Sequence, residues 1–436
     1  MKTYIITICI LIIGFNIYAQ EILTESEALK ITLENNYDIK VIEKSVETAK
    51  NNASVFNSGY LPTATLNSGA NYSNDNSSFE SQDGTITDVN GASSTNYNAS
   101  IGLNYVLFDG LNRKYSYKKL KETLNLTELQ ARQVIETSLL SLYIAYYAVA
   151  RLTENEDNQK QTLDISKRRL LRAEYSFTYG QNTKLDVLNA EVDVNNDSIS
   201  YLDIQRQLTN SKRNLNVVLG RDAALTNFNV ETNVNYVIGL DISSLLNNAL
   251  NNNVTLLQVN KGLELSNFDI SIQKSGWMPT VSASTSYAYN KTINDDSFSF
   301  ASQQFDGLSA GISIGWNLFD GGLTKTQVQN AKIAVASKNV EKEQFVQQLT
   351  RDVYNAWEFY QNALFKLQVQ ETNVETNKRN FDRTNEQYKL GQVNSIDFRA
   401  AQVNLLNAER DLSQSKYDAK IAEYQLLYLA GDLLIN

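Results

Sequence analysis

The sequence predicts an α+β membrane protein in which two internal repeats supply four strands of a β-barrel and the long helices of a coiled-coil tunnel. Three observations predict this architecture. Short segments of the first half recur in the second half at a nearly constant offset. Each half also holds Gly- and Pro-free stretches far longer than globular helices, and four segments alternate apolar with small polar residues.

The first 19 residues have the features of a secretory signal peptide. Lys2 supplies a positive charge, residues 4–18 are apolar apart from one Thr and one Asn, and Ala19 precedes a polar pair. This stretch is too short and wrongly flanked for a membrane-spanning helix. Cys9 lies inside it and follows a bulky Ile, which argues against a lipoprotein cleavage site.

The composition of the remaining chain excludes several function classes. It contains no cysteine and no histidine, which removes cysteine nucleophiles, Ser-His-Asp triads, disulfides and nearly every zinc site. We therefore predict no enzyme and no catalytic, metal or cofactor-binding residue. The excess of acidic over basic residues disfavours nucleic acid as a partner. No run of eighteen apolar residues follows Ala19, so a membrane crossing would require strands.

Two proline-containing segments reveal the repeat. Ser-Gly-Tyr-Leu-Pro-Thr surrounds Pro62, and Ser-Gly-Trp-Met-Pro-Thr surrounds Pro279. Leu-Phe-Asp-Gly ends at Gly110 and again at Gly321. The offset differs slightly between the two pairs, and the change falls in a polar stretch, where extra length is tolerated. We expect a first repeat over residues 20–220, an equatorial region with the start of the second repeat over 221–253, and the rest of the second repeat over 254–436.

The long stretches without glycine or proline predict long helices. Residues 111–179 and 323–390 contain no Gly or Pro, and at about 1.5 Å per residue each would form a helix roughly 100 Å long. A Gly-containing turn and a second such run follow each of them. We predict helices at 111–179, 183–219, 322–389 and 394–430. Five apolar residues in the second helix keep the spacing of a coiled-coil seam: Leu185, Leu188, Val192, Ile199 and Leu202.

Four segments carry the strand signal, at about 62–73, 96–108, 279–290 and 307–318. Along residues 97–107, for example, Tyr, Ala, Ile and Leu alternate with Asn, Ser and Gly. Such alternation over about 10 residues is typical of transmembrane barrels, although half-buried strands of a soluble sheet show it too. The polar stretches 74–95 and 290–306 are expected to be surface loops.

Prolines and glycines mark the junctions between helices and strands. Pro62 and Pro279 can end a helix and admit the first strand residue, and Gly110 and Gly321 release the chain in the other direction. Four strands cannot close a barrel, because single-chain barrels start at eight. Unpaired edges in lipid would cost several kcal/mol per backbone group, so we expect the chain to oligomerise.

The order of these motifs resembles the TolC family of outer-membrane efflux ducts over essentially the whole mature chain. Gly-Tyr-Leu-Pro and Gly-Trp-Met-Pro precede the first strands, Phe-Asp-Gly follows the second strands, and Tyr-Lys-Leu-Gly-Gln precedes the last helix. The resemblance implies a homotrimer with a twelve-stranded barrel in outer-membrane lipid, a helical tunnel in the periplasm and an equatorial collar. It implies a passive exit duct for small molecules or polypeptides in tripartite efflux or type I secretion, with a periplasmic adaptor and an inner-membrane pump as partners.

The resemblance also implies a gate at the periplasmic tip of the helices. Its positions in this sequence are Phe177, Gly180, Asp186, Tyr388, Gly391 and Asp397. The sequence departs from the family at Val393, where a gate arginine is expected, and at Ala400, where a second acid is expected.

The two acids also have a purely structural interpretation. Thr183 and Asp186 form a Thr-x-x-Asp capping box, and Asn394 and Asp397 have the same spacing. Capping and a role in the pore both stay open at this point. In the first long helix, Tyr143, Tyr146 and Tyr147 are expected to fill a seam between helices.

Two other interpretations of the chain are a secreted or surface coiled-coil stalk without a pore and a carboxylate-based hydrolase. The four alternating segments argue against the stalk. The absence of a convergent acid pair argues against the hydrolase.

Overall fold

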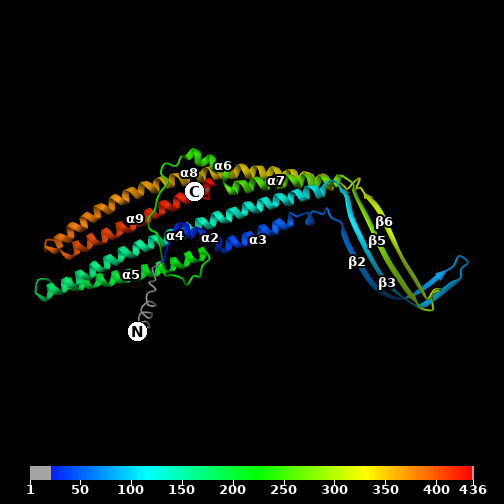
Figure 1. The fold of residues 1–436 in the computed structure, drawn as a ribbon, viewed down its shortest axis with the longest axis horizontal. Helices are drawn as coiled ribbons and strands as arrows, with labels where there is room; N and C mark the ends of the chain where they lie inside the picture. The colour runs from blue at the N-terminus through cyan, green and yellow to red at the C-terminus, as the bar shows by residue number, and fades with distance from the viewer. Residues whose placement is uncertain (1–20, 435–436) are drawn as a thin grey trace, which may run out of the picture. The chain divides into compact units, whose positions relative to one another are not determined.

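The computed structural model describes residues 21–434 (Figure 1); the predicted signal peptide lies outside them. The chain divides into two compact units. The first comprises the described residues up to Ser45, Glu128–Gln258 and the described residues from Lys342 onward, and the second comprises Val46–Thr127 and Val259–Glu341. None of the helices in the described part of the chain has a stretch apolar enough to cross a membrane.

A four-stranded antiparallel sheet dominates the second unit. It contains β2 (Thr63–Glu80), β3 (Ile86–Asp109), β5 (Thr280–Asn294) and β6 (Ser302–Gly315), in the order β2-β3-β5-β6. The pairing of β3 with β5 joins the two halves of the sequence in one sheet. Strands β2 and β6 form its two edges (Figure 1).

The register gives the sheet two faces of different chemistry. One row across all four strands is apolar, and the adjacent row, which points to the opposite face, consists of small polar residues. The apolar row is Leu66, Ile101, Tyr287 and Leu308, and the polar row is Thr65, Gly102, Ser286 and Ser309. All four apolar side chains are exposed in the single chain.

The strands extend further than the sequence predicted. Most of the expected loop 74–95 is strand, since β2 runs to Glu80 and β3 begins at Ile86. The expected loop 290–306 likewise shrinks, while β6 ends at Gly315, before its predicted end. The additional strand residues are mostly polar, so they keep the backbone hydrogen bonds of the sheet but lack the regular apolar-polar alternation from which strands are predicted.

Four long helices form two hairpins. These are α4 (Asn112–Thr178) with α5 (Lys184–Leu219) and α8 (Leu323–Lys389) with α9 (Ser395–Ala430). The ends of all four helices agree closely with the predicted boundaries. Helices α4 and α8 both have 67 residues, and α5 and α9 both have 36.

Shorter elements complete the chain. They are the strands β1 (Glu21–Leu23) and β4 (Phe228–Val230), which pair in parallel, the helices α2 (Glu25–Asn35), α3 (Tyr37–Asn52), α6 (Ile242–Asn252) and α7 (Val254–Lys274), and the 3-10 turns η1 (Val55–Asn57) and η2 (Ser275–Trp277).

Helices α5 and α9 end in the same kind of joint. Gly220 ends α5 in the left-handed region at φ 68°, and a Cβ there would lie 2.3 Å from the carbonyl oxygen of Asn35. Gly431 ends α9 at φ 76°, and a Cβ there would lie 2.7 Å from the backbone of Asn252. In both joints the close approach of backbones requires glycine.

The tyrosines of α4 pack as predicted. Tyr143, Tyr146 and Tyr147 are all buried in the core of the first unit. The ring of Tyr143 stacks on Tyr424 of α9 at 3.8 Å, and the Tyr146 hydroxyl donates to the carbonyl oxygen of Leu23 at 2.8 Å. These rings therefore fill a helix seam and fix the first described strand.

The equatorial region contains an extended strap, residues 231–241, that crosses the helices without regular structure. Side chains of α4, α8 and α9 hold its backbone through hydrogen bonds from Tyr360 to Val237, from Trp357 to Leu240, from Lys420 to Asn235, and from Glu231 to Tyr146.

The predicted coiled-coil seam of α5 does not pack inside the chain. Its five residues, Leu185 to Leu202, are 47–64% exposed. The side of α5 that packs on the rest of the chain is a different one, which includes Val187, Ala190 and Leu208. Spacing alone identifies an apolar helix face but not the partner of that face.

Candidate functional site: the tips of the helical hairpins

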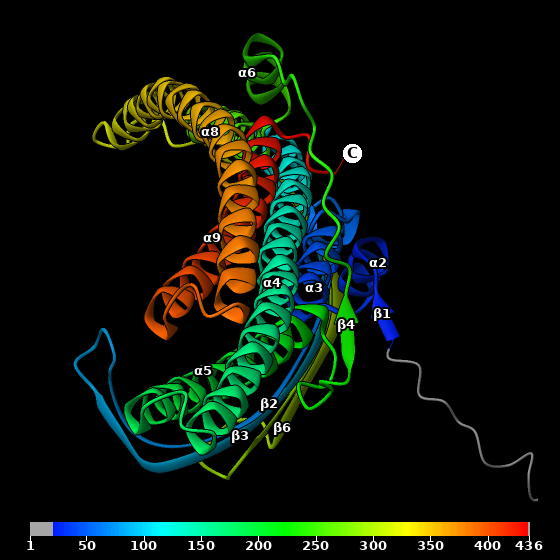
Figure 2. The same cartoon turned by 90° about the vertical axis from the view of Figure 1, so that its left-hand side faces the viewer.

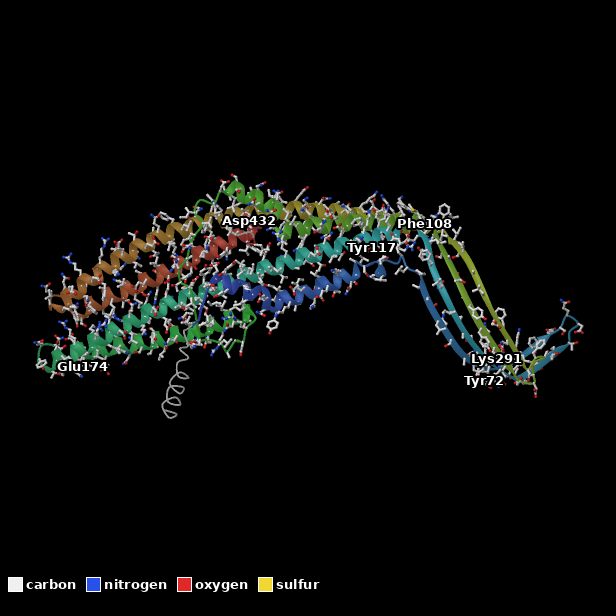
Figure 3. The ribbon with its side chains drawn as sticks, viewed as in Figure 1. Tyr72, Phe108, Tyr117, Glu174, Lys291 and Asp432 are labelled. Carbon is white, nitrogen blue, oxygen red and sulfur yellow. The ribbon has the colours of Figure 1, made fainter. Side chains whose placement is uncertain are left out.

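Each of the two hairpins turns through a glycine at its tip. The tips point toward the viewer in Figure 2. Gly180 (φ 71°) follows α4 and Gly391 (φ 73°) follows α8. A Cβ at either position would meet no atom within 4 Å. These two predicted residues are thus required for backbone conformation alone, unlike Gly220 and Gly431. Figure 3 marks this end of the first hairpin by Glu174, in the last turns of α4.

The two predicted gate acids differ in their surroundings. The carboxylate of Asp186 accepts hydrogen bonds from the backbone N–H and the hydroxyl of Thr183, at 3.1 and 2.8 Å, which completes the capping box. At the start of α9 the side chain of Asn394 caps the N–H of Asp397 at 2.8 Å, while the carboxylate of Asp397 is exposed. Capping therefore occupies the carboxylate of Asp186 but not that of Asp397.

Tyr388 lies in a contact between the hairpins. Its ring centroid is 4.7 Å from that of Phe398 in α9, and the guanidinium of Arg172 in α4 lies 5.3 Å from it. Arg172 also donates to the carbonyl oxygen of Lys389 at 2.7 Å. The aromatic and cationic groups thus connect the end of α8 to α4 within one chain.

The other predicted gate positions make fewer contacts with the rest of the chain. Phe177 is exposed, with the ammonium of Lys184 at 5.7 Å from its ring. Val393 is half-buried and Ala400 is exposed. Ala400 lines a groove of about 530 Å³ between α5 and α9, together with Asp193 and Arg399.

An ionic cluster beside this groove is not predicted by the sequence. Two nitrogens of Arg399 in α9 donate to the two carboxylate oxygens of Asp197 in α5, both at 2.7 Å. The Nε of Arg399 lies 3.5 Å from Asp193, and the hydroxyl of Ser166 in α4 donates to Asp197 at 2.6 Å. A forked Arg–carboxylate pair of this kind is the strongest class of side-chain hydrogen bond.

Further polar groups surround this pair. The side-chain amide of Gln402 donates to the carbonyl oxygen of Thr162 at 2.9 Å and to Ser166 at 3.1 Å. Arg169, which is 3% exposed, pairs with Asp193. We call Ser166, Arg169, Asp193, Asp197, Arg399 and Gln402 the Arg399 cluster. Arg399 and Asp197 lie far apart in the sequence, so no local pattern reveals their pairing.

Burial and neighbouring charges shift the pKa of Arg399 in opposite directions. Burial alone would lower the pKa of its guanidinium, but the hydrogen bonds and charge of Asp197, with the charge of Asp193, raise that pKa above its ordinary value. The arginine therefore keeps its positive charge despite its burial.

The helix–strand junctions lie where the sequence predicted them. Pro62 and Pro279 directly precede β2 and β5. Gly110 has φ 68°, and a Cβ there would lie 2.7 Å from the carbonyl oxygen of Ser275; Gly321 has φ 67° and open space around it. Within residues 21–434, no group of three acidic side chains is arranged to hold a metal ion.

Comparison with known proteins identifies the family. The family model described as outer membrane efflux protein matches residues 28–221 and 245–432. The chain is 21% identical over 296 residues to the outer membrane protein TolC of Vibrio cholerae, with 68% of each protein covered. It is 21% identical over 335 residues to the outer membrane efflux protein BepC of Brucella suis, covering 76% of this chain and 71% of that protein.

The fold agrees with this assignment. The outer membrane channel CmeC of Campylobacter jejuni superposes with a TM-score of 0.76 at 16% identity, over 94% of this chain and 86% of that one. The paired long helices, the small antiparallel sheet and the matched sequence together place this chain in the outer membrane efflux protein family, as a TolC-like export channel of the outer membrane.

Proposed function

We propose that three copies of the chain close a twelve-stranded barrel and a helical tunnel, which together form a passive exit duct from the periplasm to the outside. The observation that carries this proposal is the open sheet. Its strands alternate in direction from β2 to β6, so β6 of one copy can pair antiparallel with β2 of the next. Closure removes the two edges, whose unpaired backbone groups lipid does not tolerate.

The exposed seam of α5 supports the same assembly. Its five apolar residues have no partner helix in the described part of the chain, and α8 also exposes apolar side chains, among them Phe359, Phe365 and Val369. Packing α5 of one copy against α8 of a neighbour would bury both sets. Buried apolar area contributes about 25 cal/mol per Å².

The equal helix lengths and the two glycine joints support an internal duplication. Each chain would then contribute two equivalent hairpins, and three chains would contribute six, to one ring of twelve helices. A duplicated hairpin makes such a ring nearly regular, which suits a tunnel of uniform bore.

The polar face of the sheet supports a hydrated and permissive lumen. Gly102, Ser286 and Ser309 offer small hydroxyl and backbone surfaces rather than a shaped pocket. The cargo would be small molecules or polypeptides, delivered by a periplasmic adaptor and an inner-membrane pump. The apolar row on the other face would contact outer-membrane lipid.

The acids at the hairpin tips would set the ion preference of this duct. In a trimer, Asp186 and Asp397 supply six carboxylates, and rings of charge determine ion selectivity. We expect purified protein to form channels in planar lipid bilayers that prefer cations. We expect the double variant Asp186→Asn and Asp397→Asn to reduce that preference, measured as a shift of the reversal potential in a salt gradient toward zero.

The single variants separate capping from pore charge. Asp397→Asn should account for most of the shift without loss of stability, because its carboxylate is exposed. Asp186→Asn should also weaken the start of α5 by about 1 kcal/mol. Reversal potentials that stay unchanged in all three variants would reject the pore role of these acids. Failure of the wild-type protein to conduct ions at all would reject the duct.

A further inference from the structure

The two hairpins of one chain are tied together through Arg399, about one turn inside α9. The forked pair with Asp197 joins α9 to α5, and the same guanidinium lies 3.3 Å from the hydroxyl of Ser166 in α4. Gln402, one turn further along α9, reaches the carbonyl oxygen of Thr162 in α4. Three helices from both hairpins therefore meet at one cation.

The partners of Arg399 are buried, which makes their separation costly. Asp197, Ser166 and Gln402 are each at most 4% exposed. If α9 moved away from α5, the carboxylate of Asp197 would lose both nitrogens of Arg399 and keep only the hydroxyl of Ser166. A buried charge without its partner is strongly unfavourable, so the pair opposes any motion that parts the hairpins.

Nearer the tip the hairpins also meet where Arg172 contacts the ring of Tyr388 and the carbonyl oxygen of Lys389, but that contact is exposed and pairs no carboxylate. Val393 carries no polar group, Ala400 carries no acid, and the carboxylate of Asp186 is engaged in its own helix cap. Asp397 forms no hydrogen bond or ion pair through its carboxylate within residues 21–434. The forked ionic contact between the hairpins thus lies deeper in the bundle than the turns.

We propose that Arg399 is a positioning residue that holds the α8–α9 hairpin against the α4–α5 hairpin of the same protomer, and that its pairing with Asp197 keeps the tunnel tip narrow. This assignment rests on the duct proposed above. All residues of the contact belong to one chain, so it needs no residue of a neighbour. Opening the tip then requires the Arg399–Asp197 pair to break in each protomer.

Single-channel conductance of the purified, full-length protein in planar bilayers tests this inference. Arg399→Gln removes the guanidinium, and Asp197→Asn removes the carboxylate charge without changing the size of the side chain; we expect each to raise the conductance at least threefold over wild type. Arg399→Lys keeps the charge but loses the fork, so its conductance should be intermediate. The exchange of both residues, Arg399→Asp with Asp197→Arg, should return the conductance toward the wild-type value.

Arg206→Gln is the matched control. Arg206 also belongs to a hairpin helix and pairs with Asp203, but both side chains are more than half exposed. Exposed pairs contribute little, so this variant should conduct like wild type. If Arg399→Gln does not assemble, Asp197→Asn, an isosteric change, decides the question alone.

The outcomes separate the two proposals. Channels of wild-type conductance in Asp197→Asn and in every Arg399 variant that assembles would overturn the role of Arg399 and leave the duct intact. An equal rise in conductance in Arg206→Gln and Arg399→Gln would overturn that role as well. Absence of any conductance from wild type and all variants would instead reject the duct itself.

Discussion

Glycine serves two different purposes in this chain, and the two can be told apart by substitution. Gly220 combines a left-handed backbone with close contact to Asn35, whereas Gly391 has the same backbone region in open space. We expect Gly220→Ala to destabilise the protein by about 3 kcal/mol, because conformational strain and steric overlap add. Gly391→Ala should cost only about 1 kcal/mol. Thermal unfolding followed by circular dichroism measures both, and equal losses would contradict the packing role of Gly220.

The half-buried acid Glu409 gives the stability of the chain a predictable pH dependence. Burial raises the pKa of this carboxyl in α9 above its ordinary value of 4.5, although the charge of Lys378 lowers it in part. A carboxyl whose pKa is raised by folding stabilises the protein while it is protonated. That contribution is complete below the ordinary glutamate pKa and is lost as the pH rises through the folded-state pKa.

Glu409→Gln should therefore raise the midpoint of thermal unfolding at pH 8. The difference from wild type should disappear as the pH falls to about 4.5. Glu174→Gln, at an exposed site near the end of α4, is the control and should change nothing at either pH. A stabilisation by Glu409→Gln that persists unchanged at acidic pH would show that the charge of Glu409 is not its cause.

At the scale of elements, the strap 231–241 depends on side chains rather than on its own backbone pairing. Lys420 donates to Asn235 in the strap and to the buried carboxylate of Glu423, which also accepts from the N–H of Val237. Removing Lys420 leaves Glu423 buried without a counter-charge, which costs about 3–5 kcal/mol. The strap should then open locally while the long helices persist.

Lys420→Met tests this dependence through limited proteolysis with chymotrypsin. We expect cleavage after Tyr236 in the strap to become at least ten times faster than in wild type. Lys416→Met is the control, because Lys416 pairs with Glu154 at a partly exposed site. A cleavage rate that is equal in the two variants would show that Lys420 does not secure the strap.

The long helices could be predicted from the sequence more accurately than any other element. Glycine and proline interrupt a helix for local reasons, so their absence from 111 to 179 and the return of glycine at Gly180 and Gly220 mark the helix ends. The strands are longer than predicted because residues 74–80 and 86–95 are mostly polar and their few apolar residues do not alternate regularly with polar ones. Their hydrogen bonds do not depend on side-chain polarity, and alternation therefore cannot reveal them.

Contacts between helices that lie far apart in the sequence could not be predicted from the sequence. The turns at Gly180 and Gly391 and the cap at Asp186 are local features, and spacing alone located them. The Arg399–Asp197 pair requires knowledge of which face of α9 lies against α5, and no residue near Arg399 in the sequence carries that information. The exposed seam of α5 shows the same limit, since its apolar face is visible in the sequence but its partner is not.

At the scale of the whole molecule, the described part of the single chain leaves backbone and apolar groups without partners. Its sheet has two unpaired edges, both faces of that sheet are open, and the apolar seam of α5 is exposed. In the proposed trimer, pairing of β6 with β2 would close the sheet, and packing of α5 on α8 of a neighbour would cover the apolar seam. The copy number is therefore the quantity on which the proposed duct depends.

Native mass spectrometry of the protein extracted from outer membranes in detergent measures that copy number. We expect a particle of three identical chains that lack residues 1–19 and that dissociates only when the detergent-solubilised protein is heated. A particle of one chain, or an assembly of any other copy number, would contradict the twelve-stranded duct.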